Sequence, residues 1–171
     1  MSNIVTKLRG GDRRSIGRSN EVVQEISRNP KLFSQVFEAL LQADPVLRMR
    51  AADAIEKATV MHPDFLQPYK RRILQKVAAV DQQEVRWHVA QMLPRLRLTP
   101  TERDRAVSIL FAYLEDKSSI VRTCAMQSLA DIALQDPRLE VRFMPLLEHL
   151  TATGSPAMRS RGRKLLAVLR R

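Results

Sequence analysis

The sequence predicts an all-α fold in which about four helical hairpins stack on one another and a further helix caps the C-terminal end. Three observations lead to this prediction. Apolar residues make up 44% of the 171 residues and aromatic residues only 5%, and the Leu, Ala, Val, Ile and Met that dominate suit helix packing better than sheets. An apolar motif recurs about every 37 residues. Five prolines follow residues that commonly cap helices.

The recurring motif is an aliphatic residue, an arginine directly after it, a small residue four positions on and another aliphatic residue eight positions on. Its copies begin at Leu47, Val85, Val121 and Met158, which are 38, 36 and 37 residues apart. The copy at Val85 has the larger Val89 in the small position. Positions i, i+4 and i+8 line one face of a helix. The motif therefore predicts one buried helix face per repeat, edged by the arginines Arg48, Arg86, Arg122 and Arg159.

A second apolar series keeps nearly the same period. It consists of the pairs Leu40-Leu41, Ile73-Leu74, Ile109-Leu110 and Leu146-Leu147, which are 33, 36 and 37 residues apart. Two series with one period indicate two helices in each repeat, and a period of about 37 residues is typical of helical-hairpin arrays.

Helix starts are marked by a capping residue followed by proline, because proline is well tolerated at the first helical position. The five pairs are Asn29-Pro30, Asp44-Pro45, Thr99-Pro100, Asp136-Pro137 and Ser155-Pro156, and Thr99 forms a possible capping box with Glu102. Pro94 and Pro145 predict kinks or late starts. The predicted helices span 19–28, 30–42, 45–60, 64–79, 82–97, 100–115, 118–135, 137–151 and 156–170. They form hairpins over about 19–43, 44–79, 80–116 and 117–152, followed by a capping helix over 155–171.

An aspartate at the turn, a Val-Arg pair, a small residue and a leucine together resemble the HEAT repeat of the armadillo-like families. Asp81 with Val85-Arg86 and Asp116 with Val121-Arg122 carry the resemblance most clearly, and it covers roughly residues 44–171. The resemblance implies a right-handed α-α superhelix, or α-solenoid, whose second helices line the concave surface. It also favours a role in stacking for the repeated arginines, which would ladder with aspartates and backbone carbonyls.

The net charge of +11 and the pI of about 10.8 favour an acidic protein, a nucleic acid or an anionic membrane surface as partner. Residues 1–18 contain Gly10-Gly11 and predict a basic, flexible N-terminal arm outside the repeat domain of 19–171. The single cysteine, Cys124, cannot form an intramolecular disulfide, which indicates a reducing, cytoplasmic location. No apolar run is long enough to predict a membrane span.

Candidate binding residues are basic side chains on the second helices and at the C-terminus, together with the only tryptophan. They are Lys70, Arg71, Arg105, Arg142, Arg161, Arg163, Lys164 and Trp87. A basic groove fit for an acidic peptide or a phosphate backbone and a merely solvated basic face remain alternatives. Trp87 is either a binding anchor or a residue packed between repeats.

The sequence predicts a non-catalytic scaffold that binds a protein or peptide along the concave surface. A nucleic-acid binder is the alternative, and a HEAT-like DNA alkylation-repair glycosylase is a more remote one, because Trp87 has Gln91 rather than an acid one turn later. His62, His88 and His149 are far apart in the chain, so the spacing predicts no metal site and no catalytic residues. No small-molecule cofactor is expected.

Overall fold

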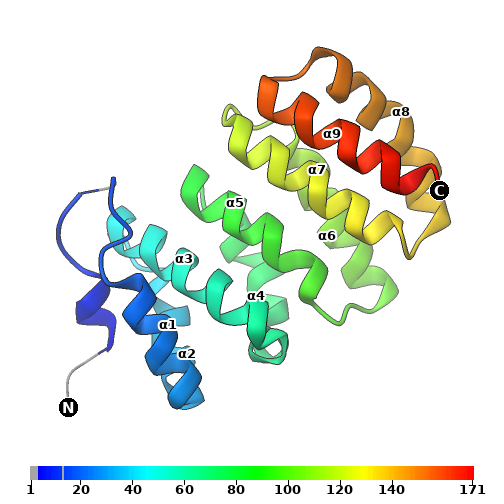
Figure 1. Ribbon diagram of the computed structural model, residues 1–171. Helices are drawn as coiled ribbons and strands as arrows, with labels where there is room; N and C mark the ends of the chain where they lie inside the picture. The colour runs from blue at the N-terminus through cyan, green and yellow to red at the C-terminus, as the bar shows by residue number, and fades with distance from the viewer. Residues whose placement is uncertain (1–3, 13) are drawn as a thin grey trace. The chain divides into compact units, whose positions relative to one another are not determined.

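A computed structural model describes residues 4–12 and 14–171 (Figure 1). Within these ranges the chain is all-helical, as predicted, and no helix is long and apolar enough to cross a membrane. The chain divides into two compact units, residues 1–97 and 98–171. The first contains α1 (Ser19–Arg28), α2 (Phe33–Ala39), α3 (Pro45–Met61), α4 (Lys70–Gln75) and α5 (Gln83–Met92). The second contains α6 (Pro100–Tyr113), α7 (Ser119–Ala133), α8 (Pro137–Thr153) and α9 (Pro156–Leu169).

All five predicted caps are present. The Asp44 side chain accepts hydrogen bonds from the backbone N–H groups of Val46 and Leu47, at 2.9 and 3.3 Å. Thr99 and Glu102 form the predicted capping box, in which each side chain accepts from the other's backbone N–H. The side chains of Asn29, Asp136 and Ser155 cap the helical turns that follow them in the same way. These caps satisfy N–H groups that have no partner within the helix.

The second helices of the first unit are more broken than predicted. The predicted helix 64–79 is a 3-10 helix over Pro63–Tyr69, then α4, then a 3-10 turn over Val77–Ala79. Pro68 lies inside the first of these segments and lacks the N–H that a continuing α-helix needs. The predicted helix 30–42 begins with a 3-10 turn over Pro30–Leu32, and its α-helix ends at Ala39. Pro94 ends α5 in a 3-10 turn as expected, whereas α8 continues past Pro145.

The repeated apolar motif is buried, except for Leu166 in the last copy, which is partly exposed. In α3, which packs against α1, α2 and α5, the motif residues Leu47, Ala51 and Ile55 are fully inaccessible to solvent. In the second unit, α9 packs against α7 and α8 (Figure 1). There the small motif residue is Gly162, and a Cβ at this position would lie 2.0 Å from the Thr151 hydroxyl oxygen. A glycine is therefore needed for the close approach of α9 to α8.

Two of the repeated arginines make contacts near the starts of their helices, and those of Arg48 reach a neighbouring repeat. Arg48 donates hydrogen bonds to the Gln82 side-chain oxygen at 2.8 Å and to the Gln42 carbonyl at 3.1 Å, and Gln82 donates to the Pro45 carbonyl at 2.8 Å. Arg86 lies 3.0 Å from the Asp81 carboxylate. Arg48 therefore connects the start of α3 to the residue before α5, whereas the Arg86–Asp81 ion pair lies at the start of a single hairpin.

The segment before α1, for which the sequence predicts a flexible arm, packs onto α3 where it is described. Ile4 and Leu8, in a 3-10 helix over Ile4–Leu8, are buried. Arg50 of α3 is only 4% exposed. Its guanidinium donates to carbonyl oxygens of this segment, namely those of Leu8, Arg9, Gly10, Asp12 and Ser15. A buried cation must satisfy its donors, and the loop supplies the acceptors.

The same loop depends on Gly17. This residue has a φ of +59°, and a Cβ here would lie 2.8 Å from the Arg50 guanidinium. Both the left-handed backbone and the nearby guanidinium require that no side chain be present.

Replacing Arg50 by Met should detach the segment before α1 and lower the free energy of unfolding by about 3 kcal/mol, because five buried or part-buried hydrogen bonds to this segment are lost. Urea unfolding and amide hydrogen exchange would measure the two effects. An Arg28→Met variant, at an exposed position on α1, is the control and should change neither. Unchanged protection of residues 4–12 in the Arg50 variant would contradict this account.

Candidate binding sites in the two units

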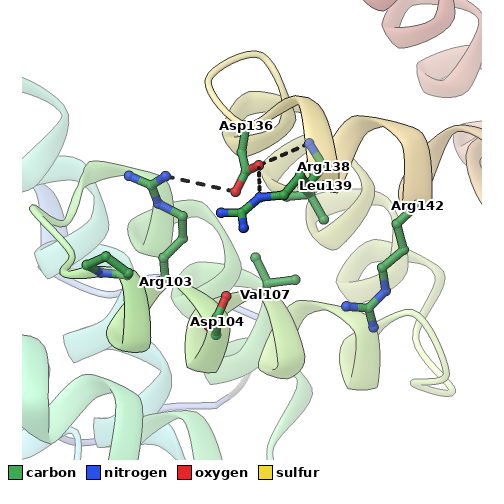
Figure 2. Close-up of a pocket in the computed structure, with 8 residues that line it drawn as sticks. Arg103, Asp104, Val107, Asp136, Arg138, Leu139 and Arg142 are labelled. Atoms are coloured by element: carbon green, nitrogen blue, oxygen red, sulfur yellow. Dashed lines mark hydrogen bonds and ion pairs between the residues drawn. The ribbon is translucent and has the colours of Figure 1, made fainter.

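A groove of about 450 Å³ lies between α6 and the beginning of α8 (Figure 2). Its apolar wall consists of Val107, Leu139 and Pro100. Its charged lining consists of Arg103, Asp104, Asp136, Arg138 and Arg142. The groove thus combines three guanidinium groups and two carboxylates with an apolar surface.

Helical spacing places these side chains together. Arg103, Asp104 and Val107 are three and four positions apart and share one face of α6. On α8, Leu139 and Arg142 are three positions apart and face the same groove. The Asp136 cap sets where α8 begins and so where its first turn meets α6 (Figure 2).

Asp136 organises the charges at one end of the groove. Its carboxylate accepts a hydrogen bond from the Arg138 backbone N–H at 3.1 Å and lies 3.7 Å from the Arg138 Nε. It also lies 3.9 Å from an Arg103 guanidinium nitrogen. The Arg138 side chain is 95% exposed, so much of its donor capacity faces solvent.

At the other end, Arg142 is held by an aromatic ring. Its guanidinium carbon lies 4.3 Å from the centre of the Phe111 ring, and the side chain remains exposed. A cation over an aromatic face is attracted to it, and the stacking restricts the rotamers of a long side chain. Arg142 is therefore preoriented while its donors stay available for a ligand.

A groove of this composition can hold a carboxylate or another small oxyanion next to an aliphatic group. Guanidinium groups bind carboxylates through two parallel hydrogen bonds, and Val107 and Leu139 offer apolar contact. Among its described lining residues there is no cysteine, serine or histidine.

Only one of the sequence-predicted basic residues lines this groove, namely Arg142. Arg105 is exposed elsewhere on α6. Arg161 donates to the Gln127 side-chain oxygen at 2.6 Å, and Arg163 and Lys164 are exposed on α9. Arg103 and Arg138 were missed because no single helical face contains both of them.

In the first unit, the predicted basic face of α4 is partly engaged in internal contacts. Lys70 donates to the Arg97 carbonyl at 3.2 Å, and Arg71 is exposed. Arg72 forms two hydrogen bonds with the Glu38 carboxylate, and these bonds hold the pKa of Glu38 below its ordinary value. Trp87, the remaining predicted residue of this unit, lines a hollow to which neither Lys70 nor Arg71 contributes.

Trp87 lines a second hollow, of about 250 Å³, between α3 and α5 and next to residues 14–16. The other lining residues of the two helices are Met49, Arg50, Asp53, Glu84 and His88. Glu84, Trp87 and His88 are three and four positions apart and so share one face of α5.

The carboxylates of this hollow differ in their surroundings. Asp53, 7% exposed, accepts from the Lys57 ammonium at 2.9 Å and from the Ser19 hydroxyl. Glu84 is 9% exposed, and its side chain has no hydrogen bond or ion pair with any residue in 4–12 or 14–171. One carboxylate is thus balanced within the protein and the other is not.

His88 is also 9% exposed, and its Nδ1 has no hydrogen-bond partner among the described atoms. Burial lowers the pKa of His88 below its ordinary value of 6.5. The nearby carboxylates of Asp53 and Glu56 oppose this shift, and the cations of Lys57 and Arg95 add to it. The imidazole is therefore neutral at pH 7.

Within the described part of the chain, no three His, Cys, Asp or Glu side chains are close enough together to hold a metal ion. Comparisons with protein-family models, with curated proteins and with solved structures found no match for this chain.

The depressed pKa of His88 should make stability depend on pH. Stability should be full above about pH 6.5 and fall below it, because the unfolded chain then binds a proton that folded His88 resists. A His88→Gln variant should lose less stability between about pH 7.5 and pH 5.5 than the wild type. Urea unfolding at both pH values measures this, with His149→Gln, at an exposed position, as control. Equal losses in wild type and His88→Gln would refute the assignment.

Proposed function

We propose that the protein is a non-catalytic binding scaffold built as a right-handed solenoid of HEAT-like hairpins, and that it binds an acidic protein segment. The observation that carries the proposal is the groove between α6 and α8, where Arg103, Arg138 and Arg142 surround an apolar wall. The buried apolar motif supports the repeat architecture, since its copies begin 38, 36 and 37 residues apart in the sequence.

The groove suits an acidic peptide better than a phosphate backbone. A nucleic-acid strand presents charges at regular short intervals, so Asp104 and Asp136 in the lining would repel part of it. A peptide can place its carboxylates at Arg138 and Arg142 and an aliphatic side chain against Leu139. The mixed lining therefore selects a ligand that alternates acidic and apolar groups.

Preorientation of the arginines supports useful affinity. Arg142 is stacked on Phe111, and the guanidinium of Arg103 lies near the Asp136 carboxylate. Side chains that already occupy the bound geometry lose less conformational entropy when a ligand arrives. A few such anchors are enough for a specific contact.

Nucleic-acid binding is a second candidate because of the composition of α9. This helix contains no acidic residue, and its exposed cations are Arg159, Arg161, Arg163 and Lys164. Such a surface could contact phosphates without sequence readout.

Arg138→Gln combined with Arg142→Gln should weaken the binding of a fluorescent peptide that alternates glutamate and leucine by about tenfold or more, because two charge-assisted contacts are lost. Fluorescence anisotropy measures the affinity. The same peptide with glutamine in place of glutamate should bind weakly to both proteins.

Arg159→Gln combined with Arg163→Gln is the matched control, since it removes the same charge from exposed positions on α9. It should leave peptide affinity within about twofold. If the α9 variant weakens binding as much as the groove variant, the proposed site is wrong. Tight binding of a single-stranded oligonucleotide, with a log–log salt slope of about −0.7 per phosphate contact and loss in the α9 variant, would favour the second candidate.

A further inference from the structure

We propose that the hollow between α3 and α5 is a second binding site, for an organic cation. Its ligand is an ammonium or amidinium-type group attached to an apolar or planar body. Glu84 provides the countercharge, and the Trp87 ring provides a face for the cation and the body to contact.

The first argument is the state of Glu84. Its side chain is nearly buried, and no donor among the described residues is bonded to it. The Glu84 oxygens are not among the fully buried atoms that lack a partner, so water is their donor, and the partial withdrawal of a carboxylate from water still has a cost. The position of Glu84 in the first turn of α5 offers some compensation from the helix dipole, but it provides no donor from the described residues. A ligand that donates charged N–H groups would remove this cost.

The second argument is the arrangement around the carboxylate. Trp87 lies one helical turn from Glu84 on the same face of α5, and it is only half-buried. Met49, from α3, adds an apolar wall that is 6% exposed. An indole face attracts cations, most strongly where water is excluded. His88 adds a neutral imidazole ring, and its Nδ1 atom has no hydrogen-bond partner within the described residues.

Three cations, those of Arg50, Lys57 and Arg14, lie in or near the hollow, and the first two have partners within the protein. The Arg50 guanidinium is committed to the backbone carbonyls of the segment before α1. Lys57 is paired with Asp53 at 2.9 Å. Arg14 lines the hollow but is exposed, so its charge is screened by solvent. The lining thus contains two cations, Arg14 and Arg50, and two carboxylates, and among these four groups Glu84 is the charged group that is nearly buried and has no partner among the described residues.

Intrinsic fluorescence tests the proposal directly, because Trp87 is the only tryptophan in the chain. The probes are benzamidine, benzamide and benzoate, which have nearly the same size and shape but carry a positive charge, no charge and a negative charge. Benzamidine should change the fluorescence saturably, and benzamide and benzoate should bind at least about tenfold more weakly.

Glu84→Gln in the full-length chain should weaken benzamidine binding by about tenfold, because the amide keeps the shape and removes the charge. Glu115→Gln, at an exposed position in the second unit, should leave it unchanged. Calorimetry with Trp87→Phe checks that binding persists with a smaller aromatic face. Peptide binding in the α6–α8 groove should be the same in Glu84→Gln and wild type, so the two proposals fail independently.

Three results would overturn the proposal. The first is a purely linear fluorescence response to benzamidine, which indicates collisional quenching rather than a site. The second is equal affinity of the wild type and Glu84→Gln for benzamidine. The third is tighter binding of benzoate than of benzamidine, which would assign the hollow to anions held by Arg14.

Discussion

The first unit depends on one constraint: α3 is buried on most of its surface and still carries charged residues. Its aliphatic stripe packs against neighbouring helices, and a charge on an adjacent face cannot simply reach solvent. Arg50 is satisfied by backbone carbonyls of the segment before α1, and Asp53 by Lys57 and Ser19. Satisfying buried polar groups therefore decides how the N-terminal segment runs and where the hollow beside α5 opens.

The two candidate sites use opposite electrostatic designs. In the groove of the second unit, arginines outnumber carboxylates, and Arg138 and Arg142 remain exposed although their positions are restrained. In the hollow of the first unit, Arg50 is engaged with backbone carbonyls, Arg14 is exposed, and Glu84 is the carboxylate without a partner among the described residues. The net charge of +11 predicts neither design, because a ligand responds to the charges that face it rather than to their sum.

The arginines of the repeated motif are not the residues that form the α6–α8 groove. The resemblance to HEAT repeats favours a stacking role for them. Arg48 does bridge neighbouring segments through Gln82, whereas Arg86 pairs with Asp81 at the start of its own hairpin. The residues that line the α6–α8 groove are instead mostly outside the repeated motif. A residue that recurs in every repeat is constrained by the packing that recurs there. A binding site is instead built from side chains that differ from one repeat to the next.

Local physics explains what the sequence by itself determined. The all-α class, the five caps and the buried motif follow from helical periodicity and from hydrogen bonds a few residues apart, so Asp44 or Thr99 can be interpreted without knowledge of the rest of the chain. Only the tertiary structure decided which charges meet. Arg103 and Arg138 share a groove because α8 begins beside α6, and Arg50 contacts a loop some 40 positions away in the chain. Such contacts depend on how helices pack, and no local spacing encodes them.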